Sequence, residues 1–176
     1  MIRQIALCCT LSLFPVFAMA QTVGPVAGER EITLSGSGGS DKNFDSGNFS
    51  ISGDYGWYRS NNMLLGIRQS IQYQNIEGVN FRNDNWNGST RGFLDWHFGS
   101  TSWRPFVGLS LGAVYGDNID DSAFAGLELG FKYYVLPKTF LMARGEYQFF
   151  FEDTDDIDSS FDNGAWVYTL GMGYNF

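Results

Sequence analysis

Along most of this chain, apolar and polar side chains alternate, and turn-forming residues recur at intervals of roughly ten positions. A period of two is the period of a β-strand, and no segment shows the period of an amphipathic helix. We therefore predict an all-β chain with eight antiparallel strands. The predicted strands are residues 29–38, 48–58, 63–74, 89–98, 105–115, 123–135, 140–151 and 165–176.

Two architectures share this alternation: a soluble barrel with an apolar interior and a membrane barrel with an apolar exterior. Charge placement separates them, because every charge in predicted strands two to eight falls on the polar side, four basic and four acidic. An Arg or Lys facing lipid near mid-bilayer would cost roughly 2 to 4 kcal/mol, whereas a closed lumen favours paired charges. We predict an up-and-down transmembrane β-barrel with a filled polar lumen. Its predicted lumen charge network is Asp54, Arg68, Arg91, Asp95, Glu128, Lys132, Arg144 and Glu146.

The first twenty residues have the features of a cleaved signal peptide: Arg3, an apolar stretch over 5–17 and an Ala18-Met19-Ala20 cleavage site. Both cysteines lie inside this segment, so the barrel domain, residues 21–176, contains none. A disulfide framework and a thiolate metal site are thereby excluded, and we expect no cofactor. The mature chain carries ten basic and 19 acidic side chains, a net charge of −9 that argues against nucleic acid as a partner.

Predicted connections between strands alternate in length. The long ones are 39–47, 75–88, 116–122 and 152–164, and the short ones are 59–62, 99–104 and 136–139. Bacterial membrane barrels have short periplasmic turns and long outer loops, so both termini are predicted to be periplasmic. Thirteen acidic and two basic residues fall in the predicted outer loops, which makes the outer surface acidic.

Aromatic side chains gather at both predicted rims, as they do at bilayer interfaces. The predicted girdles are Trp57, Tyr58, Trp103, Tyr133 and Tyr134 at one rim, and Tyr73, Tyr115, Phe151 and Trp166 at the other.

The last strand alternates through Tyr168, Leu170, Met172, Tyr174 and Phe176. This ending resembles the sorting signal of bacterial outer-membrane proteins, and the mature chain resembles the eight-stranded OmpA/OmpX-like barrels. The resemblance implies that the barrel-assembly machinery reads Tyr174 and Phe176. It also implies a monomer in the outer membrane of a Gram-negative bacterium, in contact with membrane lipid and lipopolysaccharide. It assigns no activity, because one fold hosts many functions.

Four carboxylates in the last predicted loop are weak candidates for binding divalent cations, which prefer oxygen ligands: Asp153, Asp155, Asp156 and Asp158. The segment lacks the glycine and the final glutamate of an EF-hand loop. A solvated acidic loop is the alternative interpretation.

The only histidine, His97, lies on the lumen side of the alternation, two residues from Asp95. No nucleophile accompanies it on the lipid-facing side, so we predict a structural histidine hydrogen-bonded to a carboxylate. The expected function is non-enzymatic, a structural or surface-interaction role exercised through acidic extracellular loops. A narrow ion or solute channel is the first alternative, and a lipid A-modifying enzyme is the second.

Overall fold

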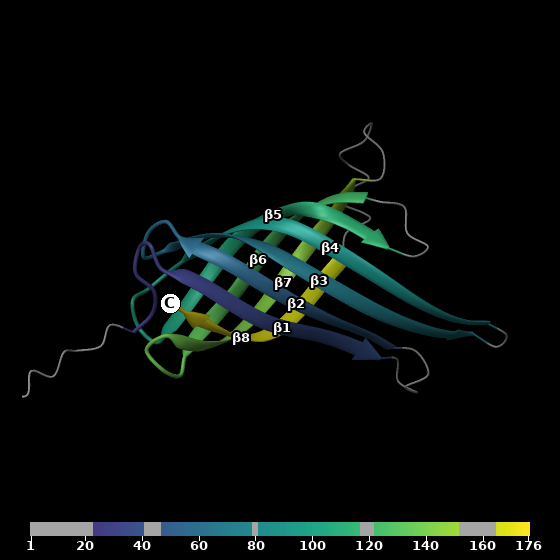
Figure 1. The fold of residues 1–176 in the computed structure, drawn as a ribbon, viewed down its shortest axis with the longest axis horizontal. Coiled ribbons are helices and arrows are strands. Elements are labelled where there is room, and N and C mark those ends of the chain that lie inside the picture. The colour runs from purple at the N-terminus through teal and green to yellow at the C-terminus, as the bar shows by residue number, and fades with distance from the viewer. Residues whose placement is uncertain (1–22, 41–46, 79–80, 117–121, 152–164) are drawn as a thin grey trace, which may run out of the picture.

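The computed structural model describes residues 23–40, 47–78, 81–116, 122–151 and 165–176, and these form eight strands. The strands are β1 (Arg30–Ser40), β2 (Gly47–Tyr58), β3 (Met63–Gly78), β4 (Phe81–His97), β5 (Trp103–Gly116), β6 (Ser122–Tyr134), β7 (Thr139–Phe151) and β8 (Ala165–Asn175). Each strand pairs with the next in antiparallel fashion, and β8 pairs with β1 to close the barrel (Figure 1). The predicted eight-stranded up-and-down barrel is confirmed. Among the described residues, no helix is long and apolar enough to cross a membrane.

Outward-facing positions of the barrel carry apolar side chains, and inward-facing positions carry polar ones. Leu111, Leu129 and Leu170 are exposed on the outer wall, whereas Arg68 and Glu146 inside it are fully buried. A barrel in water would have the opposite arrangement, because burying charges and exposing a continuous apolar wall are both costly there. Of the two architectures that the alternation permits, the structure therefore has the one with the apolar exterior.

The predicted long loop over 75–88 is wrong, because β3 and β4 continue into it. β3 runs to Gly78 and β4 starts at Phe81, and these two residues are register partners at the end of the hairpin. The segment is rich in Asn, Asp and Gly, which are typical of turns. Beyond the apolar wall, two strands can still pair through backbone hydrogen bonds without an apolar face. The β3–β4 hairpin therefore continues past the point where apolar and polar residues stop alternating.

Other strand ends differ from the predicted ones by at most two residues. One of the two-residue shifts starts β5 at Trp103, which brings Arg104 into a strand. The predicted signal peptide at 1–20 and most of the loops at 39–47, 116–122 and 152–164 lie outside the described residues.

We call the end where β1 begins and β8 ends the proximal end, and the opposite end the distal end. Residues 23–29 lie across the proximal end: the Gly24 amide donates to the Pro137 carbonyl (2.9 Å), and the Gly28 amide donates to the Tyr58 carbonyl (2.8 Å). Arg104 Nη2 donates to the Val23 carbonyl at 2.9 Å. Gly24 has a φ of +92°, and a Cβ there would lie 2.5 Å from the Arg104 guanidinium, so only glycine fits.

Candidate functional site

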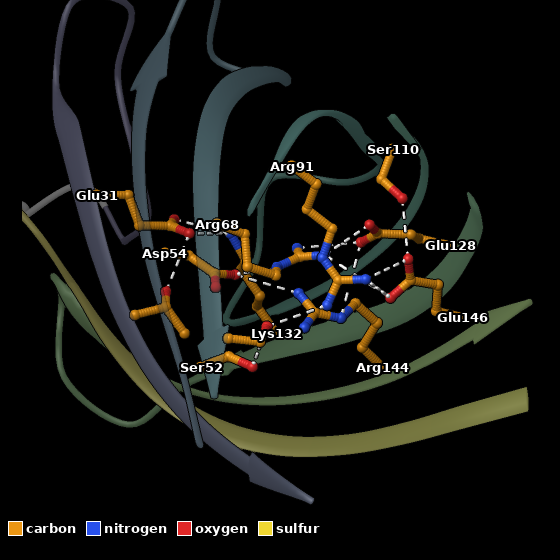
Figure 2. Close-up of polar contacts among 12 residues, drawn as sticks. Glu31, Ser52, Asp54, Arg68, Arg91, Ser110, Glu128, Lys132, Arg144 and Glu146 are labelled. Carbon is orange, nitrogen blue, oxygen red and sulfur yellow. Dashed lines mark hydrogen bonds and ion pairs between the residues drawn. The ribbon is translucent and has the colours of Figure 1, made fainter. Parts of the chain in front are cut away.

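Buried charged side chains meet along the axis of the barrel. Successive side chains of a strand point alternately into and out of the barrel, so each strand places every second side chain in the lumen. Figure 2 shows side chains from β1, β2, β3, β4, β6 and β7 extending toward a common centre. Among the described residues, five basic and five acidic side chains are buried, so their charges sum to zero: Arg68, Arg91, Arg104, Lys132 and Arg144, with Glu31, Asp54, Asp95, Glu128 and Glu146.

Six of these residues form what we call the central cluster: Asp54, Arg68, Arg91, Glu128, Arg144 and Glu146. Arg68 holds it together. Its Nε donates to Asp54 Oδ2 at 2.9 Å, and its two Nη atoms donate to the two Glu128 oxygens at 2.7 and 3.2 Å. Bidentate Arg–carboxylate pairs are among the strongest hydrogen bonds in proteins, and this one has no solvent exposure.

The other two arginines complete the central cluster. Arg144 Nη1 lies 3.2 Å from Asp54 Oδ2, and its Nε lies 3.7 Å from Glu128 Oε2. Arg91 Nη1 donates to both Glu146 oxygens, at 2.8 and 2.9 Å, and Ser110 Oγ donates to Glu146 Oε1 at 2.9 Å. Three guanidinium groups thus face three carboxylates, and the cluster ties β2, β3 and β4 to β6 and β7 across the lumen.

A second group, the proximal cluster, consists of Glu31, Tyr58, Lys132 and Asn175. Lys132 Nζ donates to the two Glu31 oxygens at 2.6 and 2.7 Å. Tyr58 OH donates to Glu31 Oε2 at 2.6 Å, and Asn175 Nδ2 donates to the same oxygen at 3.2 Å. The first and last strands are therefore connected through one carboxylate, close to where the barrel closes.

Sequence reasoning missed Glu31, and it placed Asp95 in the network. The structure brings seven of the eight predicted residues into ion pairs; Lys132, however, pairs with Glu31. Asp95 forms no ion pair within the described part of the chain, and its Oδ1 is buried without a hydrogen-bond partner. The missed signal was parity, because Glu31 shares its side of the strand with Thr33 and Ser35.

Arg104 and His97 also differ from expectation. Arg104 falls in the predicted short connection 99–104, but it is buried against residues 23–24, since the earlier start of β5 turns it inward. His97 is fully buried with both ring nitrogens unbonded, and its ring packs against those of Tyr58 and Phe106 at 5.7 and 5.3 Å. The predicted carboxylate hydrogen bond of His97 is absent, and its environment is an aromatic one.

Two members of the predicted aromatic girdle belong to the lumen. Tyr58 and Tyr134 are buried, and Tyr134 OH donates to Asn175 Oδ1 at 2.9 Å. Tyr174 and Phe176, the predicted assembly signal, are exposed on the outer wall with their rings stacked 6.4 Å apart.

Within the described residues, no three His, Cys, Asp or Glu side chains are placed to hold a metal ion. The metal candidates Asp153, Asp155, Asp156 and Asp158 lie outside those residues.

Toward the distal end the lumen opens into what we call the distal cavity, with a volume of about 470 Å³. Hydroxyl and amide side chains line most of it, among them Ser50, Ser89 and Gln148, and Arg91 of the central cluster also borders it. Below this cavity, Arg68, Phe106 and Lys132 have no solvent exposure. The interior is thus open to small polar groups at one end and occupied by packed side chains in its centre.

No known protein-family description matches this sequence, and no curated protein matches it. Solved structures do. The N-terminal β-barrel domain of OprF from Pseudomonas aeruginosa is 22% identical over 86% of this chain and 100% of that one, with a TM-score of 0.57. The outer-membrane protein OprG from the same organism is 15% identical over 87% and 98% of the two chains, with a TM-score of 0.59.

Neisserial surface protein A is 16% identical over 84% of this chain and 96% of its own, with a TM-score of 0.56. These identities are low, so the similarity concerns the backbone arrangement. The chain has the fold of the small eight-stranded outer-membrane β-barrels.

Proposed function

We propose that this chain is a non-enzymatic outer-membrane barrel with both termini in the periplasm, which holds its distal loops at the cell surface for contact with lipopolysaccharide. The observation that carries the proposal is the pairing of an apolar outer wall with a charge-neutral buried interior. Such a molecule is stable only with hydrocarbon around it, because exposed leucines and buried ion pairs would both be unfavourable in water.

The centre of the lumen supports a scaffold role over a channel role. The central and proximal clusters occupy the axis with side chains that are hydrogen-bonded to one another across the barrel. An eight-stranded barrel has an interior just wide enough for side chains to fill. Contact with other molecules would then take place at the ends of the barrel. The distal end carries the long β3–β4 hairpin.

Acidic loops suit lipopolysaccharide if divalent cations bridge the two anionic surfaces. The test uses the mature chain in phosphatidylcholine nanodiscs, and its association with lipopolysaccharide is measured with and without Ca²⁺. Replacing Asp153, Asp155, Asp156 and Asp158 by Asn should weaken the Ca²⁺-dependent association. A matched control replaces Asp117, Asp120 and Asp121 by Asn in another predicted outer loop.

If the association with lipopolysaccharide changes neither with Ca²⁺ nor with the four substitutions, the loop-contact role is refuted. Planar-bilayer recordings test the scaffold role separately. The purified barrel should give no steady single-channel currents, and sizeable steady currents would favour the channel alternative. Outer-membrane insertion should also decline when Tyr174 and Phe176 are both replaced by Ser, since the assembly machinery is proposed to read them.

A further inference from the structure

One seam of the barrel is only half paired. β1 and β8 share six residue pairs, from Glu31–Asn175 to Gly36–Leu170, whereas the other seven seams have ten to sixteen. Both strands continue distally, but within the described strand residues the next four positions of each do not pair across this seam. In Figure 1, β8 leaves β1 on its way to the distal end.

The distal half of β1 pairs in full with β2, from Gly36–Ile51 to Ser40–Gly47, so only its edge toward β8 is unpaired, and its small residues give β8 little to pack against. Residues 36–40 of β1 read Gly-Ser-Gly-Gly-Ser, so the distal half of this strand has no side chain larger than serine. Glycine in a strand interior weakens pairing, because it costs more entropy and offers nothing to pack. The facing half of β8 carries Trp166 and Tyr168, both exposed on the outer wall. Unpaired backbone in a bilayer is tolerated where it lines a cavity, which is the case at this seam.

Two cavities meet at the unpaired seam. One is the distal cavity, and the other, which we call the outer groove, is a depression of about 1220 Å³ over the outward faces of β6, β7 and β8. They share four lining residues: Ser37, Trp166, Tyr168 and Thr169. All four belong to the unpaired ends of β1 and β8. The seam thus joins a polar interior space to the apolar outer wall.

The outer groove has the shape and lining for a hydrocarbon chain. Ala143 and Gly145 are small outward residues on β7. Ala143 lies between Phe131 of β6 and Leu170 of β8, and Gly145 lies between Leu129 and Tyr168, so these larger side chains form the sides. The distal cavity offers hydrogen-bonding groups instead. The hydroxyls of Ser50 and Ser89 and the amide of Gln148 line it, and each can hydrogen-bond a polar head.

We propose that the β1–β8 seam binds a single-chain amphiphile, with its hydrocarbon chain in the outer groove and an uncharged polar head passing through the seam into the distal cavity. An uncharged head is favoured because the central cluster beside the cavity has equal numbers of guanidinium and carboxylate groups. This proposal rests on the proposed membrane location, because the hydrocarbon chain would enter the outer groove from the bilayer.

A cysteine in the distal cavity tests this path. The mature chain has no other cysteine, so Ser89→Cys reports from one position. In phosphatidylcholine nanodiscs, its alkylation is followed with dodecyl maleimide, which partitions into lipid, and with a hydrophilic maleimide, which stays in water. Gly36→Trp is the blocking variant, because Gly36 lines the outer groove and a Cβ there meets only the Ser50 carbonyl at 3.6 Å. Gly92→Trp is the matched control, since Gly92 faces outward on β4 away from both cavities, with only the Gly66 carbonyl near its Cβ at 3.9 Å.

The dodecyl reagent should modify Ser89→Cys, and Gly36→Trp should slow that reaction about tenfold, equivalent to about 1.4 kcal/mol. Gly36→Trp should leave the hydrophilic reaction unchanged, and Gly92→Trp should change neither. Excess dodecyl maltoside should protect the cysteine from the dodecyl reagent. Equal rates in all variants, no dodecyl reaction, or equal slowing of both reagents by Gly36→Trp would overturn the site. Failure of the barrel to insert into nanodiscs would instead refute the proposed function.

Discussion

The proximal and distal halves of the barrel are built differently on the same eight strands. In the proximal half and the centre, ionised side chains reach across the lumen and bind one another, and all eight seams are paired. In the distal half, short hydroxyl and amide side chains leave a cavity, and one seam is open. Because both halves share the same eight strands, the difference shows that the size and charge of the inward side chains decide how far the lumen of this barrel is filled.

Removing the centre of the charge network should have the largest effect. Arg68→Met removes the closest partner of Asp54 and Glu128 and leaves them only the longer contacts to Arg144, at 3.2 and 3.7 Å. Breaking a buried ion pair from one side costs about 3 to 5 kcal/mol, because a charge remains buried and unpaired. We expect a loss of that size in the free energy of unfolding, measured by urea titration of the barrel in lipid vesicles. A loss no larger than that of the outward-facing Leu111→Ala control would contradict this role of Arg68.

A substitution in the proximal cluster should lower the free energy of unfolding less than Arg68→Met does. Glu31→Gln removes the carboxylate that Lys132, Tyr58 and Asn175 share, but a side-chain amide can still accept a hydrogen bond. We expect a loss of about 2 to 3 kcal/mol. The double variant Glu31→Gln/Lys132→Met should recover part of it, because it removes the stranded ammonium group. Additive losses in that double-mutant cycle would mean that the two side chains do not stabilise each other.

Asp95 forms an ion pair with neither cluster within the described residues, so its replacement should have an effect of opposite sign. Asp95→Asn replaces a buried carboxylate whose Oδ1 lacks a partner by a neutral group of the same shape. We expect the free energy of unfolding to rise by about 1 kcal/mol, because the cost of burying a charge is removed. A clear decrease in the same urea titration would show that Asp95 has a stabilising partner.

The half-buried Lys138–Glu29 ion pair at the proximal rim should have the smallest effect. Lys138 Nζ donates to Glu29 Oε1 at 2.8 Å, and this hydrogen bond and charge raise the pKa of Lys138 above its ordinary value. A raised pKa means that the stabilisation is fully present below the ordinary lysine pKa and is lost as the pH rises through the raised value. Lys138→Met should therefore lower the melting temperature slightly at pH 8 in low salt and not at all in high salt. A salt-independent decrease would indicate a packing role for the lysine stem.

Period-two alternation was enough to predict the strands and the apolar exterior, because outward and inward positions in a barrel wall differ in chemistry at every step. It could not predict which inward charges pair. Asp54 and Arg68 face each other across the β2–β3 hairpin, but Glu128 lies on β6, and its contact with Arg68 depends on stagger between strands that no local pattern encodes. Arg104 was missed for a simpler reason, since β5 starts two residues earlier than predicted, whereas Glu31 was missed because the parity that it shares with Thr33 and Ser35 was not used in the first strand.

The open seam was also invisible to pattern reasoning. Residues 36–40 are small and polar, and they fit the alternation of an ordinary strand. Whether such a strand pairs depends on the neighbour it meets after the chain closes on itself, and β8 is the most distant neighbour in sequence. The β3–β4 hairpin shows the reverse case, in which turn-like residues pair over a long ribbon because their neighbour is adjacent.

Thiol accessibility at two inward positions tests the contrast between the halves most directly. Ser89→Cys lines the distal cavity, and Thr33→Cys replaces a buried residue in the proximal half. With the barrel in nanodiscs and a hydrophilic maleimide added to both sides, Ser89→Cys should react readily. Thr33→Cys should react ~100-fold more slowly, because the reagent must wait for local opening. Equal rates at the two positions would contradict a lumen that is closed at its proximal end and open at its distal end.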